Sequence, residues 1–202
     1  MTWPGSKKAD AGELVLLSQD EARFPMVPTL TATLGLKGQR PQVGTWDNKG
    51  LLYVLAVVNL VTAAVHANTL ECPRDAKRKT GKSKNRRLTE AFAAHLRHVG
   101  RVYPKDRYPR VVLVIDNAPW HAGQPVDDAL RDNPHLEFYR LPRYSPQLNP
   151  IERLWRARRR RATHNRLFDS LADLKRSLRN SLCYFQTVRA RVASLIEKRF
   201  RR

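Results

Sequence analysis

The sequence has few cysteines, few acidic residues and no long uninterrupted hydrophobic run. Its two cysteines, Cys72 and Cys183, form no CxxC pair, which argues against a disulfide framework or a zinc knuckle and favours a reducing compartment such as the cytoplasm. The longest apolar run, LLYVLAVVNLVTAAV, is interrupted by Asn59 and Thr62 and falls short of a transmembrane helix. We interpret it as two paired strands joined by a turn, although periodicity alone also permits a buried helix.

The shortage of acidic residues leaves a large positive charge. Against 18 acidic residues stand 38 lysines and arginines, giving a formal charge of +20 and a pI near 10.9. Such a balance favours a nucleic-acid partner; a soluble cationic domain with no such partner is the alternative. A chain of 202 residues is long enough for one domain with a substantial core.

The region from Arg110 to Trp155 carries the clearest functional pattern. VVLVID is typical of a buried strand and places Asp116 at its carboxyl end, the edge at which α/β sheets carry their chemistry. After NAPWH come a short polar helix candidate and a second strand, LEFYRLP. YSPQLNPIERLW then puts Glu152 in the first turn of a helix.

Another acidic pair follows an earlier strand. ELVLLSQDEARF predicts a strand from Glu13 to Gln19 that ends on Asp20 and Glu21. Alternation places these two carboxylates on opposite faces, so only one of them can enter a shared site. The alternative is that both are turn residues that pair with Arg23.

IDNAPWH followed by YSPQLNPIERLW resembles the second and third acidic motifs of DDE transposases of the mariner superfamily, in the branch carried by bacterial insertion sequences. The separation of 152 − 116 = 36 positions fits the narrow spacing of that family, and the first acid matches Asp20. The resemblance runs from about Glu13 to the C-terminal helices. It implies an α/β, ribonuclease H-like fold with a mixed five-stranded sheet flanked by helices, in which 13–202 form the catalytic domain after a linker or disordered start over 1–12.

The resemblance also implies a reaction. Asp20, Asp116 and Glu152 would hold two Mg²⁺ ions roughly 4 Å apart, with Mn²⁺ as a substitute, because carboxylates are hard oxygen ligands. Water would cut the donor DNA, and the freed 3′ hydroxyl would then attack the target. Without the resemblance these acids support only metal-dependent hydrolysis. A structural alternative makes Glu152 a capping-box partner of Asn149 and Asp116 a cap of its own turn.

Basic and polar residues around the acids are candidates for DNA contact and support. Four consecutive arginines from Arg158 must cover more than one face of their helix, and a charge run near Lys82 is either a solvated loop or a phosphate-contacting one. Asn117 and Asn149 are expected to shape the acidic loops. His121 either orients the Asp116 loop or contacts the scissile phosphate, and the alternative is a hydrogen-bonded structural histidine. The predicted DNA contacts are Lys82, Lys84, Arg143, Arg153, Arg156, Arg158, Arg159 and Arg160.

Helix signals occur in two further places. LTEAFAAHLRHVG predicts a helix that stops at Gly100, with His95 and His98 at its surface or edge. Ser170 with Asp173 predicts a capping box at the start of the last helical region.

The expected partners are the transposon ends and the target DNA, with the enzyme acting as a homodimer. The 19 residues before Asp20 leave no room for a helix-turn-helix domain. We therefore expect either a catalytic half whose DNA-reading part is a separate chain or N-terminal half, or a truncated remnant that binds DNA without cutting it. A ribonuclease H-type hydrolase of another role is a third hypothesis.

Overall fold

The computed structural model describes residues 14–32, 34, 37–38, 41–45, 50–73 and 81–197. The start predicted as a linker over 1–12 lies outside the described residues, and so do the charge-rich residues 74–80 that precede Lys82.

A mixed five-stranded sheet forms the centre of the protein, as the sequence predicts. Its strands are β1 (Val15–Pro25), β2 (Gly50–Asn59), β3 (Val65–Pro73), β4 (Val111–Ile115) and β5 (Leu136–Arg140), in the order β3-β2-β1-β4-β5. The first three strands pair antiparallel, whereas β4 runs parallel to β1 and β5 parallel to β4. The long apolar run is therefore two strands, with the turn at 60–64 between them.

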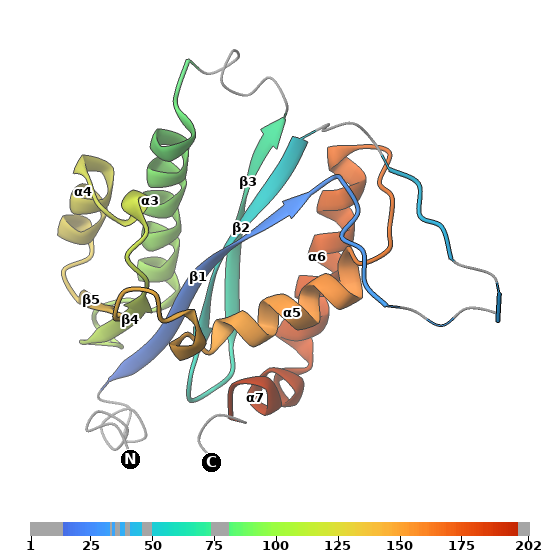
Figure 1. The fold of residues 1–202 in the computed structure, drawn as a ribbon. Helices are drawn as coiled ribbons and strands as arrows, with labels where there is room; N and C mark the ends of the chain where they lie inside the picture. The colour runs from blue at the N-terminus through green and yellow to red at the C-terminus, as the bar shows by residue number, and fades with distance from the viewer. Residues whose placement is uncertain are drawn as a thin grey trace.

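Helices cover both faces of this sheet (Figure 1). On one face lie α3 (Lys84–Val102) and α4 (Gln124–Asp132), and on the other lie α5 (Ile151–Ala162), α6 (Leu171–Thr187) and α7 (Arg189–Glu197). Two short 3₁₀ turns, η1 (Pro119–His121) and η2 (Pro146–Leu148), precede α4 and α5. The predicted capping box is confirmed, because Ser170 Oγ accepts a hydrogen bond from the backbone N–H of Asp173.

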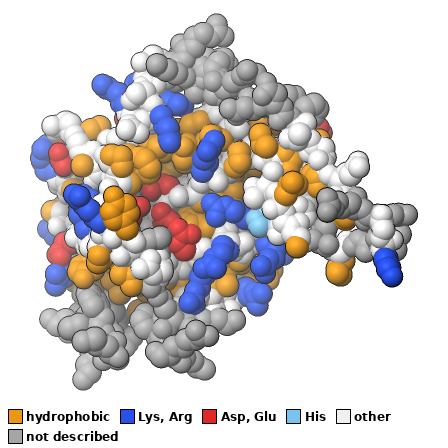
Figure 2. Space-filling model, viewed as in Figure 1, with side chains coloured by type: hydrophobic (Ala, Val, Ile, Leu, Met, Phe, Trp, Pro, Cys, Tyr) orange, Lys and Arg blue, Asp and Glu red, His pale blue; other side chains and the backbone are white. Residues whose placement is uncertain are grey.

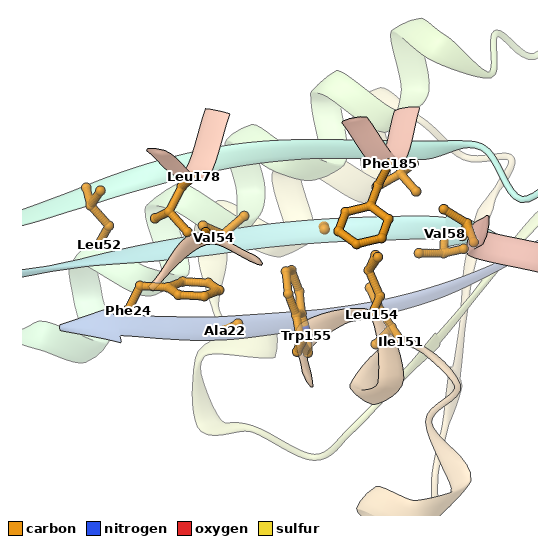
Figure 3. Close-up of a cluster of buried hydrophobic side chains, with 14 of the residues drawn as sticks. Ala22, Phe24, Leu52, Val54, Val58, Ile151, Leu154, Trp155, Leu178 and Phe185 are labelled. Carbon is orange, nitrogen blue, oxygen red and sulfur yellow. The ribbon is translucent and has the colours of Figure 1, made fainter. Parts of the chain in front are cut away.

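The sheet separates the two larger apolar clusters of the described residues, one on each face. In the cluster beneath α5 and α6, Phe24 and Trp155 meet edge to face with ring centroids 6.2 Å apart. From α6, Leu178 points toward Phe24 and Val54, and Phe185 lies beside Leu154 (Figure 3). Because each sheet face is buried by helices, β2 is apolar along its length without alternation. No helix among the described residues combines the length and apolarity needed to cross a membrane.

Two details of α3 differ from the sequence prediction. The helix continues past Gly100 to Val102, and a Cβ at Gly100 would lie 1.9 Å from Asn133 Oδ1, so this glycine permits close approach to the end of α4 and does not stop the helix. His95 is fully buried and its Nδ1 lies 2.6 Å from Asn68 Oδ1. The prediction that His95 lies at the surface was wrong, because it occupies the helix face turned to β3.

Candidate active site

Three carboxylates from three separate elements line one cavity of about 530 Å³. Asp20 comes from β1, Asp116 from the loop after β4 and Glu152 from the first turn of α5. The cavity is completed by the loops at 117–120 and 141–145 and by Asn149. The three acids predicted from the sequence are thus brought together around one space.

Strand register explains why Asp20 and Asp116 are level with each other. The parallel pairing of β1 with β4 ends at Ser18 opposite Val114, and two residues further along each strand come Asp20 and Asp116. Because β4 ends at Ile115 while β1 continues to Pro25, the two chains separate there. The separation opens the cavity at the carboxyl edge of β4, where α/β sheets hold their ligands.

Asn149 ties the start of α5 to β1. Its side-chain amide donates to the backbone carbonyl of Gln19 at 2.9 Å, and its carbonyl oxygen accepts a hydrogen bond from the buried Ser18 hydroxyl. The capping role suggested for Asn149 was therefore wrong, because the N-cap residue of α5 is Pro150 and no side chain caps the helix. The hydrogen bonds instead hold Glu152 at a fixed place relative to Asp20.

Asp20 is largely buried and receives a hydrogen bond from Trp155 Nε1 at 2.9 Å. Burial, together with the negative charges of Glu21 and Glu152, raises the pKa of Asp20 to about 8. Without a cation nearby, this carboxyl group therefore holds its proton at neutral pH. Trp155 was not predicted as a site residue. Its position one turn after Glu152 was a usable signal, because an indole N–H can only donate and a nearby carboxylate is a suitable acceptor.

Asp116 belongs to a three-member chain of acid, histidine and acid. His121 Nδ1 lies 3.1 Å from Asp116 Oδ1, and its Nε2 lies 2.9 Å from Glu21 Oε1. Burial lowers the pKa of His121, but the bonds to the two carboxylates outweigh it and raise that pKa to about 9. The same hydrogen bond lowers the pKa of Asp116. An imidazolium that donates from both nitrogens therefore orients the Asp116 carboxylate.

Glu21 faces away from the cavity, as strand alternation predicts for one of the two neighbouring acids. Its side chain is 3% exposed and also accepts a hydrogen bond from Gln19 Nε2 at 2.8 Å. Its contact with His121 joins residues 100 positions apart, which no local sequence pattern reveals. Asn117, the other predicted supporting residue, donates to the Leu141 carbonyl at 2.6 Å and joins the two loops of the cavity.

Basic side chains gather beside the acids on the face that carries the cavity, over α5 (Figure 2). Arg143 lines the cavity, and Arg156 and Arg160 are exposed. Arg153 is partly buried, and Arg159 packs over the ring of Phe24.

Lys82 and Lys84 lie at the start of α3. Lys82 pairs with Glu90 at 2.8 Å, and the Lys84 ammonium lies 5.9 Å from the ring centroid of Trp120, a cavity residue.

Arg158 is a correction to the predicted DNA contacts. Its side chain is 1% exposed, stacks beside Phe24 and Trp155, and donates from Nη2 to the Leu178 carbonyl at 3.0 Å. The buried positions of α5 are Ile151, Leu154, Trp155, Arg158 and Ala162. Arg158 therefore falls on the apolar stripe that faces the core, and it cannot reach DNA from there.

The three carboxylates that line the cavity offer the hard oxygen ligands that suit a divalent cation such as Mg²⁺. Their present spacing is looser than a finished site. Among the described residues no three His, Cys, Asp or Glu side chains come close enough to hold a metal ion. The hydrogen bond to His121 turns Asp116 toward its own loop.

A mixed five-stranded sheet with acids at the separation of two parallel strands defines a ribonuclease H-like domain of the nuclease type. Residues 15–175 match the family described as DDE superfamily endonuclease, and the chain belongs to that family. The family expected from the acidic motifs is therefore confirmed.

Similar proteins agree with this assignment. The chain is 27% identical over 164 residues, 80% of its length, to the insertion element IS630 uncharacterized 39 kDa protein of Shigella sonnei. It spans 43% to 59% of the lengths of the curated relatives it matches. Its fold is similar to the catalytic domain of Mos1 mariner transposase, with a TM-score of 0.56 at 18% identity, covering 96% of this chain and 83% of that one. A Mos1 mariner paired-end complex with Mn gives a TM-score of 0.59 at 20% identity, covering 91% and 54%.

Proposed function

We propose that this chain is the catalytic domain of a transposase that cuts and joins DNA strands during transposition of an insertion sequence. The observation that carries the proposal is the convergence of Asp20, Asp116 and Glu152 on one cavity in a chain of the DDE superfamily. The substrate is double-stranded DNA at the element ends and at the target. The charge of +20 suits that polyanion.

In this proposal the three carboxylates hold two divalent ions, Mg²⁺ or Mn²⁺. Bound ions would activate the attacking oxygen and stabilise the leaving oxygen of the scissile phosphodiester. The protein's own contribution is orientation. Trp155 Nε1 fixes one oxygen of Asp20, His121 fixes Asp116, and the amide of Asn149 fixes the helix that carries Glu152.

The exposed arginines position the DNA. Arg143 at the cavity rim contacts the phosphates next to the scissile bond, while Arg156 and Arg160 hold the backbone along α5. Arg153, Arg159, Lys82 and Lys84 complete the proposed contacts. Phosphate contacts of this kind give affinity without sequence preference. Recognition of the element ends therefore falls to a helix-turn-helix part outside this domain, and pairing of two ends calls for a homodimer.

Nicking of a supercoiled plasmid in Mg²⁺ or Mn²⁺ tests the proposal without knowledge of the recognised ends. Asp116→Asn should abolish nicking, whereas its DNA affinity stays close to that of the parent, because the loss of one carboxylate removes no phosphate contact. Asp106→Asn is the matched control, since Asp106 is exposed and lies outside the cavity.

Two outcomes would contradict the proposal. Equal nicking by Asp116→Asn and the parent would mean that another site cuts the DNA. A parent that binds DNA but leaves the plasmid intact with either metal would be a DNA-holding remnant of a transposase.

A further inference from the structure

A second polar cavity, of about 460 Å³, lies between the end of α5 and the middle of α6. We call it the α5–α6 pocket, and its lining residues are Arg161, Arg166, Ser177, Asn180 and Ser181. The lining offers two guanidinium groups, two hydroxyls and one amide but no carboxylate. This combination suits an anion that accepts several hydrogen bonds.

A buried hydroxyl in this pocket lacks a partner. Ser181 is 2% exposed, and its Oγ forms no hydrogen bond with any described residue. An unpaired buried polar group costs roughly 1–3 kcal/mol. A ligand with oxygen acceptors in the pocket would supply the missing partner.

The two arginines are available to such a ligand. Within the described part of the chain, neither Arg161 nor Arg166 forms an ion pair with a carboxylate. The guanidinium carbon of Arg161 lies 3.8 Å from the ring centroid of Tyr184. Stacking on an aromatic ring limits the rotamers of the guanidinium while leaving its edge free to donate.

The buried side chain of Arg158 adds positive charge next to the pocket. Arg158 contacts the carbonyl of Leu178, one turn before Ser181, and its Nε and Nη1 are buried without partners among the described residues. Burial lowers the pKa of Arg158 to about 10, and no neighbouring negative charge in the described part of the chain opposes that effect. The junction of α5 and α6 therefore holds uncompensated positive charge that an anion would stabilise.

We propose that the α5–α6 pocket binds a phosphodiester group of the DNA backbone. The planar forks of Arg161 and Arg166 match phosphate oxygens in pairs, and the Ser181 hydroxyl donates a further hydrogen bond. In taking DNA as the ligand, this inference rests on the proposed function. Arg161 follows Glu152 by nine residues of α5, about 14 Å along the helix axis. The pocket thus provides a second anchor away from the acids.

Binding of a 30-base-pair duplex in EDTA, at several salt concentrations, tests this site. Arg161→Gln and Arg166→Gln should each weaken binding about tenfold and reduce the slope of log K against log salt by about 1. Arg179→Gln is the matched control, because Arg179 is an exposed arginine of α6 outside the pocket. An equal loss in the Arg179 variant would mean that only net charge matters, and it would overturn the proposal.

Two variants that leave the net charge unchanged distinguish specific binding in the pocket from non-specific attraction to positive charge. Ser181→Ala and Asn180→Ala should weaken binding about threefold without changing the salt slope, because neither removes a charge. Asn180 is exposed, so its variant also serves if Ser181→Ala alters folding. Parent-like binding by both variants would refute the pocket.

Inorganic phosphate is the second probe. It should shift the side-chain Nε–H resonances of Arg161 and Arg166 but not that of Arg179. If phosphate produces these shifts while the arginine variants bind DNA like the parent, the pocket takes a free oxyanion, and the DNA assignment fails. Because all these measurements are made in EDTA, their outcome is independent of whether the protein nicks plasmid.

Discussion

Replacing Asp20 by asparagine should stabilise the metal-free protein at alkaline pH. The pKa of Asp20 rises from 3.8 to about 8 on folding, so the folded state binds more protons than the unfolded state between these values. The free energy of unfolding of the parent therefore falls as the pH rises from about 4 to about 8. The substituted asparagine carries no charge and can still accept the hydrogen bond from Trp155. The free energy of unfolding of the variant should therefore not fall over this pH range.

The size of the effect follows from the shift. About four pKa units at about 1.4 kcal/mol each give an upper limit of about 6 kcal/mol. Relaxation and water entry reduce such costs in proteins, and we expect about 2 kcal/mol at pH 9. For a domain of this size that corresponds to a rise in Tm of about 4–8 °C.

Urea denaturation in EDTA at pH 3.5 and pH 9 measures this difference. At pH 3.5 Asp20 of the parent is largely protonated in both the folded and the unfolded state, so the two proteins should have nearly equal unfolding free energies. Asp116→Asn gives the opposite contrast, because the pKa of Asp116 is lowered by His121. Its charged form stabilises the fold at neutral pH, and that contribution is lost as the pH falls. A gain from Asp20→Asn that is the same at both pH values would refute the assignment of the cost to the buried charge.

Three further sets of substitutions test other parts of the structure. Arg160→Gln should lower the salt slope of DNA binding by about 1, whereas Arg158→Met should leave it unchanged because Arg158 is buried; duplex titrations at several salt concentrations decide between them. Gly100→Ala should lower the free energy of unfolding by about 2 kcal/mol in urea denaturation, because the added Cβ clashes with Asn133. Adding Asn133→Ala to that variant should recover part of the lost stability; no recovery would mean that the clash is not the cause. Asn149→Ala should cost about 2–4 kcal/mol, since it breaks two buried hydrogen bonds to β1; thermal unfolding that matches the parent would contradict this.

The strands and the placement of the acids could be predicted from the sequence because both depend on local pattern. VVLVI and LEFYR are compact apolar or alternating segments, Asp116 follows the end of β4, and Glu152 stands in the first turn of α5. The prediction that the first strand ends at Asp20 was wrong, because β1 continues to Pro25 in its pairing with β2. The order of the acidic motifs indicated that Asp20, and not Glu21, enters the cavity. Strand alternation then predicted that Glu21 lies on the opposite face of the sheet.

The contacts that hold the acids could not be predicted in the same way. Glu21 with His121 and Ser18 with Asn149 are pairs 100 and 131 positions apart, and only the closed sheet brings them together. The inward direction of Arg158 did have a local signal, because it lies four residues after Leu154 on the apolar stripe of α5. Its charge concealed that signal, since arginine is rarely buried without a carboxylate.

The central position of β1 has a consequence for motion. The β1 segment 18–21 is paired with β2, and its side chains or carbonyls contact Asn149, Trp155 or His121. The amides of this segment should therefore exchange with solvent only when the whole domain unfolds. The rim at Arg143 and Tyr144 belongs to no helix or strand, and Tyr144 is 97% exposed. Its amides should exchange orders of magnitude faster. DNA would therefore contact a rigid strand, β1, that carries Asp20, and a mobile loop at Arg143 and Tyr144 that can adjust to the bound backbone.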